Sequence, residues 1–180
     1  GGTATLSSGT LSFTPNANWN GATSATVSVS DGSLATSLSV SITVSAVNDA
    51  PVCQAASLTT TEDTAASKTV VCSDVDGDTL SYTVSTAPAN GTASVNAQGA
   101  VSYTPSANYS GADSLVVRAS DGTLAATAVL SISVSAVNDA PVCTNRSIAT
   151  SEDVAGSSTI ACTDVDGDTL SYSVTALPAN

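Results

Sequence analysis

Apolar and polar residues alternate with a period of two along several stretches of this chain. Between Leu38 and Ala46 every second residue is apolar, and every residue between them is Ser or Thr. The same alternation recurs at 130–136, 80–84 and 27–29. Such a pattern predicts a β-strand with one buried face, and no stretch has the spacing of an amphipathic helix. The sequence therefore predicts an all-β protein.

Clusters of turn residues separate these strands, for example Ser30-Asp31-Gly32 and Thr104-Pro105-Ser106. Between about Val47 and Ala136 we expect strands near 52–60, 65–72, 79–86, 92–96, 99–104, 112–120 and 124–136. Seven short strands in one unit are typical of a Greek-key β-sandwich of the immunoglobulin-like kind.

The chain repeats itself at a constant offset. AVNDAPVC begins at Ala46 and again at Ala136, and DVDGDTLSY begins at Asp74 and again at Asp164, an offset of 90 residues in both cases. A fixed period predicts tandem units that stack on copies of themselves. We expect the C-terminal half of a repeat at 1–46, a complete repeat at 47–136 and the N-terminal half of a repeat at 137–180. Two explanations stay open: a window of a longer polypeptide, or like chains that complete one another head to tail.

The composition excludes some partners. Fifteen acidic and three basic residues, with no His, give a net charge of −12. Nucleic-acid binding needs clustered Lys and Arg, which the chain lacks. No apolar run approaches the ~20 residues of a membrane-spanning helix, so we expect no membrane insertion in this segment. Most apolar residues are Ala and Val, so each unit has a small core that needs additional stabilisation.

The four cysteines follow the repeat. Cys53 and Cys72 are 19 residues apart, and so are Cys143 and Cys162. This recurrence favours one disulfide within each unit, with free buried thiols as the alternative. Closing such a loop contributes roughly 3 kcal/mol in the chain-entropy model. Disulfides would indicate an oxidising compartment outside the cytoplasm, either a cell surface or a secreted filament.

Fourteen of the fifteen acidic residues fall in four recurring motifs, SDG, ND, ED and DVDGD, and only Asp113 lies elsewhere. Carboxylates concentrated in loops predict a hard divalent cation with oxygen ligands, and Ca²⁺ is the best candidate. Zinc and copper are disfavoured because the chain has no His. Asx-turns and strand caps are the structural alternative for these acids. The candidate metal ligands are Asn48, Asp49, Glu62, Asp63, Asp74, Asp76, Asp78, Asn138, Asp139, Glu152, Asp153, Asp164, Asp166 and Asp168.

DVDGD does not match an EF-hand loop. Counted from Asp74, the glycine is fourth, at Gly77, and position twelve is Ser85, whereas an EF-hand needs Gly at six and Glu at twelve.

The acidic motifs together, with the VNDAP linkers at Val47 and Val137, resemble a cadherin repeat of the bacterial cadherin-like, immunoglobulin-like type. The resemblance implies calcium at the joint between successive units. It assigns Glu62, Asp74 and Asp76 with Asn48 and Asp49 to one joint, and it assigns Glu152, Asp164, Asp166, Asn138 and Asp139 to the next. The pattern departs at Ala46, where cadherins have the leading Asp of the linker. The mid-domain acidic pair of cadherins has only Asp31 or Asp121 as a replacement.

An enzyme is not expected, because no His can act as a base and no Ser or Cys lies beside one. We predict a rigid, calcium-stabilised and disulfide-stapled rod in an extracellular bacterial filament or the stalk of a giant adhesin. Its partners would be neighbouring repeats or like chains head to tail, and exposed Ser and Thr are candidates for glycans. The alternative is an adhesive recognition module that binds carbohydrate or a partner protein. Trp19 and Tyr109, which follow TPxAN in both repeats, would then be surface aromatics rather than core residues.

Overall fold

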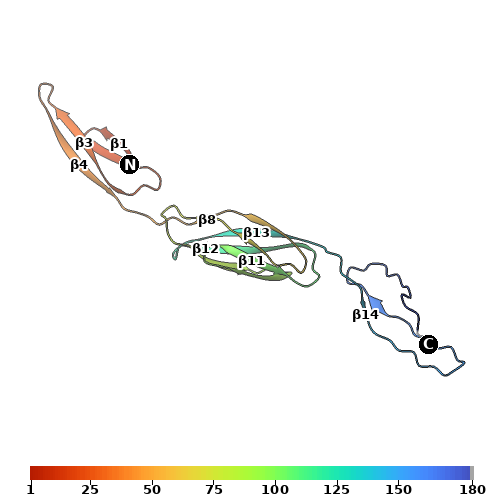
Figure 1. Ribbon diagram of the computed structural model, residues 1–180. Coiled ribbons are helices and arrows are strands. Elements are labelled where there is room, and N and C mark those ends of the chain that lie inside the picture. Colours follow the sequence, from red (N-terminus) through yellow and green to blue (C-terminus); the bar gives the residue numbers. More distant parts are fainter. Residues whose placement is uncertain (179–180) are drawn as a thin grey trace.

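The computed structural model describes residues 1–178. Three units follow one another end to end, with the N- and C-termini at opposite ends of the molecule (Figure 1). These residues form fifteen strands and no helix, so they contain no helix that could cross a membrane. The prediction of an all-β, immunoglobulin-like sandwich is confirmed.

The middle unit is a two-sheet sandwich. One sheet has four strands in the order β6-β13-β12-β9, and the other has three in the order β10-β11-β7. A short pair, β5 with β8, closes one end. The bounds are β5 (Val52–Cys53), β6 (Ala56–Thr61), β7 (Ala66–Thr69), β8 (Cys72–Ser73), β9 (Ser81–Thr86), β10 (Gly91–Val95), β11 (Ala100–Pro105), β12 (Gly111–Ser120) and β13 (Ala125–Ser135).

Two predicted strands are each divided in the structure. The stretch 52–60 splits into β5 and β6, because β5 pairs with β8 whereas β6 joins the other side of the sandwich and pairs with β13. The stretch 65–72 splits in the same way, because β7 pairs with β11 and β8 pairs with β5. Both strands change partner within a few residues, which an alternating pattern alone does not reveal.

The first and last long strands of the middle unit are parallel. β6 pairs with β13 from Ala56 opposite Leu130 to Thr61 opposite Ser135. Both strands therefore end at the same end of the sandwich. The Glu62 N–H then donates to the Ser135 carbonyl at 2.9 Å, which brings the ED motif beside the following linker.

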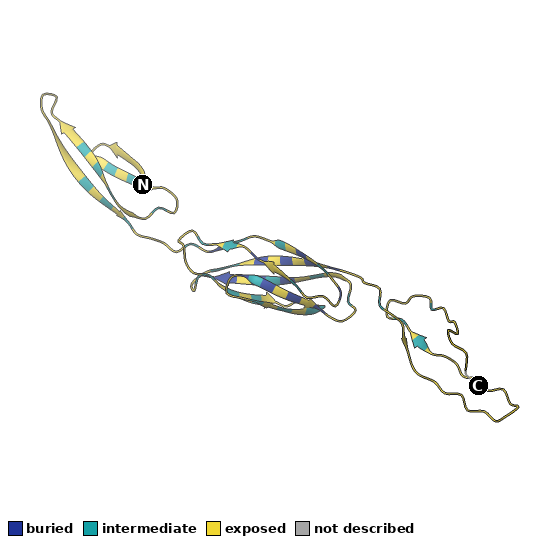
Figure 2. Ribbon diagram, viewed as in Figure 1, coloured by how far each residue is buried: buried dark blue, intermediate teal, exposed yellow. Residues whose placement is uncertain are grey.

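The hydrophobic core lies entirely in the middle unit. Buried residues gather between its two sheets and are absent from 1–46 and 137–178 (Figure 2). β13 shows the alternation most clearly, since Ala128, Leu130, Ile132 and Val134 are buried while the residues between them are exposed. Burial of one such side chain is worth about 1.5–3 kcal/mol. The largest fully buried side chains are Tyr103, Leu115, Leu130, Val70, Val101 and Val117.

The end units contain strands without an opposing sheet. Residues 1–46 form two hairpins, β1 (Gly2–Ser7) with β2 (Thr10–Pro15) and β3 (Gly21–Ser30) with β4 (Ala35–Val44). Residues 137–178 contain β14 (Val142–Cys143) paired with β15 (Cys162–Thr163). The β1–β2 hairpin has one residue fewer than β10–β11, because Gly2 pairs with Pro15 where Gly91 pairs with Pro105.

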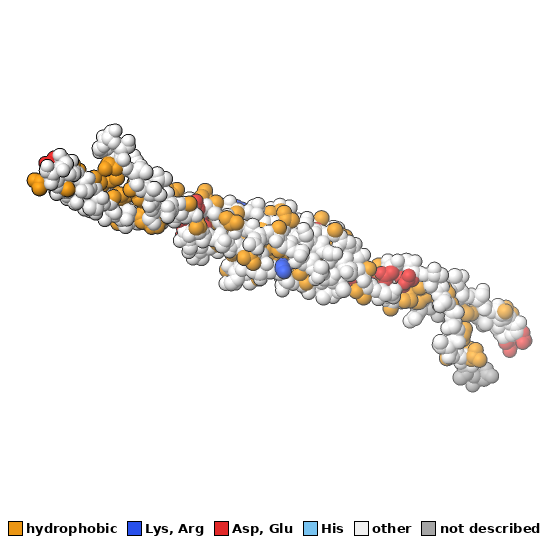
Figure 3. Space-filling model, turned by 90° about the horizontal axis from the view of Figure 1, so that it is seen from above, with side chains coloured by type: hydrophobic (Ala, Val, Ile, Leu, Met, Phe, Trp, Pro, Cys, Tyr) orange, Lys and Arg blue, Asp and Glu red, His pale blue; other side chains and the backbone are white. Residues whose placement is uncertain are grey.

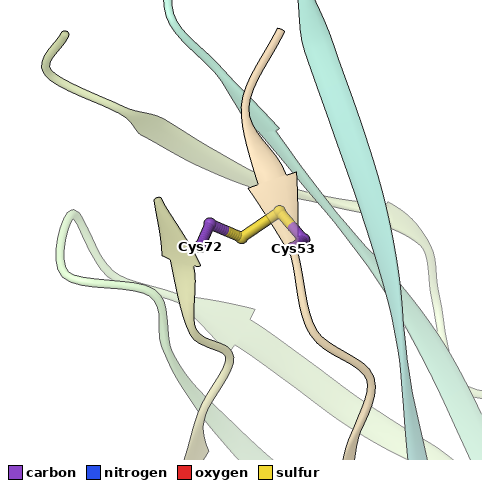
Figure 4. The surroundings of a disulfide bond; sticks show 2 residues. All are labelled: Cys53 and Cys72. Carbon is purple, nitrogen blue, oxygen red and sulfur yellow. A yellow bond between two sulfur atoms is a disulfide. The ribbon is translucent and has the colours of Figure 1, made fainter. Parts of the chain in front are cut away.

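Both predicted disulfides are present. Cys53 lies opposite Cys72 in the β5–β8 pair, and the bond joins these strands side by side (Figure 4). Cys143 lies opposite Cys162 in the β14–β15 pair and forms the second bond. Among the described residues no cysteine is free.

Candidate metal centre at the joints between units

Each linker is bound to the acidic loop that follows it. The N–H of Asp49 donates to Asp76 Oδ2 at 2.8 Å, and the N–H of Asp139 donates to Asp166 Oδ2 at 2.6 Å. Within the loop, Asp74 Oδ1 accepts the N–H of Asp76 at 2.9 Å. The DVDGD loop is therefore folded by its own first carboxylate and placed against the linker by its second. On the face shown in Figure 3, acidic side chains appear at the two joints and near both tips of the molecule, and little acidic surface is visible between the joints.

Two acids of the middle unit meet an acid of the following linker at the joint between the second and third units, which we call the second joint. Glu62 and Asp63 come from the loop after β6, and Asp139 comes from the linker. One carboxylate oxygen of each lies within 4.8 Å of the others. Glu62 is only 5% exposed, and its Oε1 accepts the N–H of Val137 at 2.6 Å.

This arrangement corrects the expected grouping of ligands. The resemblance to cadherins groups Glu62 with Asn48, Asp49, Asp74 and Asp76 at the first joint. The structure places Glu62 at the opposite end of the middle unit. The reason is that β6 runs parallel to β13 along the sandwich and delivers Glu62 to the linker that follows β13.

Glu152 and Asp153 stand in the same place in the third unit as Glu62 and Asp63 in the second, and they are not part of the second joint. The Glu62-Asp63 motif thus lies at the joint after its own unit and not at the joint before it.

The second joint contains an unsatisfied oxygen. Asp139 Oδ2 is buried and has no hydrogen-bond partner, and the same holds for Asp74 Oδ2 at the first joint, between the first and second units. Burial raises the pKa of the Asp139 carboxyl, and the neighbouring carboxylates of Asp166, Asp63, Glu62 and Asp164 raise it further. Buried carboxylate oxygens without donors, surrounded by like charges, fit a hard cation such as Ca²⁺.

Each DVDGD loop also gathers its own three carboxylates within 4.8 Å: Asp74, Asp76 and Asp78 in one, and Asp164, Asp166 and Asp168 in the other. The third acid is less constrained, since the Asp168 N–H reaches Asp164 Oδ1 at 3.3 Å and the Asp78 N–H reaches Asp74 Oδ1 only at 3.5 Å. In the linkers, the side-chain amides of Asn48 and Asn138 donate to the carbonyls of Asp49 and Asp139 at 3.2 and 3.0 Å.

Two asparagines at the joints, Asn18 and Asn108, are not among the ligands that the sequence predicts. Asn18 and Asn108 end the TPxAN motif, adopt positive φ angles of 56° and 53°, and face the following unit. The Asn108 N–H donates to Asp63 Oδ1 at 3.2 Å. The two joints have equivalent hollows, since every residue of one lies 90 positions from its counterpart. The hollows are lined by Asn18, Asp49, Ala50, Val52, Ser73, Asp74 and Val75, and by Asn108, Asp139, Ala140, Val142, Thr163, Asp164 and Val165. The recurrence of Asn at the same repeat position was the available signal.

The SDG motifs have a structural role. The Asp31 carboxylate accepts the N–H groups of Ser33 and Leu34 at 2.8 and 2.7 Å, which forms an Asx-turn between β3 and β4. The Asp121 carboxylate likewise accepts the N–H groups of Thr123 and Leu124, both at 2.6 Å, in the turn between β12 and β13. Hydrogen bonds from Leu34 and then Ser33 lower the pKa of Asp31.

Asp121 has an additional contact. Its Oδ2 accepts the side-chain amide of Asn48 at 2.9 Å, and this bond, followed by those from Thr123 and Leu124, lowers the pKa of the Asp121 carboxyl. Asp121 therefore fixes the linker Asn at the first joint, whereas Asp31 lies at the far end of its unit.

The aromatic residues after TPxAN are half-buried. Tyr109 packs against the core, and its hydroxyl donates to the Ala112 carbonyl at 2.6 Å. Its counterpart Trp19 packs edge-on against Phe13, with ring centroids 6.3 Å apart. These contacts assign both residues to the interior corner of their units.

The fold and the joints define a class of protein: immunoglobulin-like β-sandwiches connected in tandem by short linkers. Residues 48–133 match the family model for a bacterial Ig domain, and residues 1–45 match that for a cadherin-like domain. Over these residues the chain is similar to bacterial immunoglobulin-like and cadherin-like repeats. These are non-enzymatic domain families, and the domains and the disulfides together indicate an extracellular structural or adhesive module.

Several solved structures are similar. An endo-fucoidan hydrolase variant of glycoside hydrolase family 107, MfFcnA4_H294Q, is 29% identical over 74% of this chain, with a TM-score of 0.42, and the chain spans only 22% of its length. Human protocadherin-24 EC1-2 is 22% identical over 63% of this chain and 65% of its own, with a TM-score of 0.48. The surface layer protein SbsC is 15% identical over 69% of this chain and 18% of its own, with a TM-score of 0.37. No curated protein sequence matches the chain significantly.

Proposed function

We propose that this chain is part of an extracellular rod, in a bacterial filament or an adhesin stalk, whose joints are stiffened by calcium. The observation that carries the proposal is the second joint, where Glu62 and Asp63 of one unit meet Asp139 of the linker within 4.8 Å. A cation held by all three would connect the middle unit to its linker. Without one, the like charges repel each other and favour separation.

The residues present fit calcium. Glu62, Asp63 and Asp139 bring their carboxylate oxygens together, and the charges of Asp164 and Asp166 act on Asp139. Asn108 lines a hollow with Asp139 and Asp164. Calcium takes six to eight oxygen ligands in a flexible geometry, which such a set can supply together with water. When bound, the ion would supply positive charge to the buried Asp139 oxygen that has no donor. The protein itself holds the linker in place through the bonds of Val137 to Glu62 and of Asp139 to Asp166.

The linker supports the same conclusion about stiffness. Only a few residues separate β13 from β14, and none of them is glycine. Three units therefore extend along one direction (Figure 1). The exposed faces of the strands are rich in Ser and Thr rather than in charges, which gives the rod a hydrophilic surface between its acidic joints.

Small-angle scattering of the 180-residue chain tests this proposal. We expect the maximum dimension to be larger and better defined in millimolar Ca²⁺ than in EDTA at equal ionic strength. The paired substitution Glu62→Gln with Asp139→Asn should abolish this difference. Asp31→Asn is the matched control, because it removes one charge from a turn away from both joints, and it should respond to calcium as the parent chain does. Identical scattering of the parent chain in calcium and in EDTA would contradict the calcium-clamped joint.

A further inference from the structure

The middle unit has two open sides, where the last strand of each sheet lacks a neighbour. On one side β6 lies beside β7, and on the other side β9 lies beside β10. Unpaired backbone N–H and C=O groups along such edge strands form a template on which a strand of another molecule can pair. Because tandem units repeat these edges along the rod, unprotected edges would favour sideways association of neighbouring copies.

The β9–β10 side is protected by the shape of its strands. The register of β9 against β12 shifts between Val116 and Val117, which leaves Ser85 as an extra residue of β9. Such a bulge bends and twists an edge strand away from regular pairing. Neither β9 nor β10 contains a charged residue. On this side the backbone alone therefore opposes the addition of a strand.

The β6–β7 side is regular and carries a charge instead. β6 pairs with β13, and β7 pairs with β11, without a shift of register. Lys68, the one lysine of the chain, lies directly opposite the buried Val101, so both side chains leave the inner face of their sheet. Lys68 is nevertheless exposed, because its long side chain extends outward from the edge of the core. It lines the hollow between β6 and β7 with Ala56 and other residues, none of them acidic.

The third unit has a positive charge at the corresponding place, but on the other strand. The counterpart of Lys68, 90 residues further on, is Ser158, whereas the counterpart of Ala56 is Arg146. Two of the three basic residues of the chain therefore fall at the opening between the same two edges, one from each side of it. A charge that is kept at the opening while its position changes indicates a role in the opening itself rather than in one particular contact.

We propose that Lys68 prevents the β6–β7 side from pairing with an edge strand of a second copy and so keeps neighbouring rods separate. A strand added to β6 or β7 would cover the opening and bury the Lys68 ammonium where no acidic side chain compensates its charge, which is unfavourable. Arg146 has the same role in the third unit. The side strands that Lys68 guards are otherwise well suited to pairing, since β6 and β7 carry uncharged Ser and Thr beside it. The inference concerns the sides of the units and does not depend on calcium at the joints.

Sedimentation velocity of the 180-residue chain in EDTA tests this role, over roughly 1 to 100 µM so that mass action can show association. We expect Lys68→Ser to associate at concentrations at least about tenfold lower than the parent chain. Arg118→Ser is the matched control, because it removes the same charge from an exposed position on the central strand β12. Both substitutions introduce the residue found at the repeat counterpart, Ser158 or Ser28. Arg118→Ser should behave as the parent chain does, and equal behaviour of the two variants would overturn the proposal.

A rescue variant tests whether the charge at the opening, rather than Lys68 itself, is what matters. Lys68→Ser combined with Ala56→Arg gives the middle unit the arrangement of the third unit. This double variant should return to the association behaviour of the parent chain. If it associated as readily as Lys68→Ser alone, a charge at the opening would not be the cause, and the proposal would fail.

Hydrogen–deuterium exchange identifies the surface that associates. In the associated form of Lys68→Ser, the backbone amides of 56–61 or 66–69 should exchange more slowly than in the dilute variant, because a new strand pairs with their free edge. The amides of β12, which already has a neighbour on both sides, should change little. Association that left 56–61 and 66–69 unprotected would show a different interface and would also overturn the proposal.

Discussion

The hydroxyl of Tyr103 donates a hydrogen bond of 3.0 Å to Asp113 Oδ2, partly buried at the edge of the core of the middle unit. The same carboxylate accepts the N–H groups of Ala89 and Asn90 at 3.0 and 2.9 Å and so fixes the loop between β9 and β10. Asp113 is the one acid outside the repeated motifs, and its role is structural. The first unit has Phe13 and Thr23 at the corresponding positions, so the hydroxyl and the carboxylate are both absent there.

We expect Tyr103→Phe to destabilise the middle unit by about 1–2 kcal/mol, because it removes one hydrogen bond to a charged group and leaves the ring in place. In a double-mutant cycle with Asp113→Thr, the second substitution should cost less when Tyr103 is already Phe, by at least about 0.5 kcal/mol. Urea unfolding of the full chain measures these values. Tyr172→Phe is the control, since Tyr172 is exposed and should change the midpoint little. Strict additivity of the two substitutions would show that the pair is not coupled.

The stability of the middle unit should depend on the protonation of Asp113. Burial acts to raise the pKa of this carboxyl, but hydrogen bonds from Asn90, Ala89, Ser114 and Tyr103 outweigh it, and the pKa is lowered. A lowered pKa in the folded state means that the stabilisation is present above the unfolded value of about 3.9 and is lost as the pH falls through the folded value. Asp113→Asn should therefore cost about 1–3 kcal/mol at pH 7, and this cost should shrink as the pH falls through the lowered pKa of Asp113.

Urea midpoints of the parent chain and of Asp113→Asn between pH 7 and pH 2 measure this difference. A cost of Asp113→Asn that stayed constant over this range would show that the charge of Asp113 is not what stabilises the loop.

Local patterns predicted the sheets but not the partners of every strand. The alternation along Leu130, Ile132 and Val134 is enough to identify a strand with one buried face, and the recurrence of Cys53 and Cys72 is enough to pair them. The pattern does not show that β6 is parallel to β13, because pairing direction is a property of the whole sandwich. The resemblance to cadherins assigns Glu62 to the first joint, whereas this parallel pairing carries it to the second.

The joint itself was predicted in part. Acidic residues and their spacing can be read directly from the sequence, which is why the acids of the linkers and of the DVDGD loops are candidate ligands. Asn108 was overlooked because an uncharged residue in a Ser- and Asn-rich turn resembles an ordinary loop residue. Its positive φ and its bond to Asp63 depend on how the β11–β12 loop turns towards the next unit.

The disulfide of the middle unit should contribute more to its stability than the disulfide of the third unit. Replacing Cys53 and Cys72 by Ala should lower the free energy of unfolding by about 3 kcal/mol, because the bond closes a loop of about 20 residues in the unfolded chain. Replacing Cys143 and Cys162 removes an equivalent loop from a unit that has no buried core residue, and the main thermal transition should stay in place. Differential scanning calorimetry of both variants measures this. Equal shifts of the main transition would show that the two units unfold together.

Asn108 should bind the joint cation in addition to shaping the loop. Asn108→Gly separates these roles, since glycine tolerates the φ angle of 53° while the side-chain oxygen is removed. We expect this variant to fold with a normal melting temperature in EDTA but to need about tenfold more calcium for the same thermal stabilisation, which corresponds to about 1.4 kcal/mol. Asn108→Asp should shift the calcium response the other way, because it adds a charged oxygen next to Asp139 and Asp164. If Asn108→Gly lowered the melting temperature in EDTA and left the calcium response unchanged, Asn108 would serve the loop alone, through the bond of its N–H to Asp63 and its left-handed backbone.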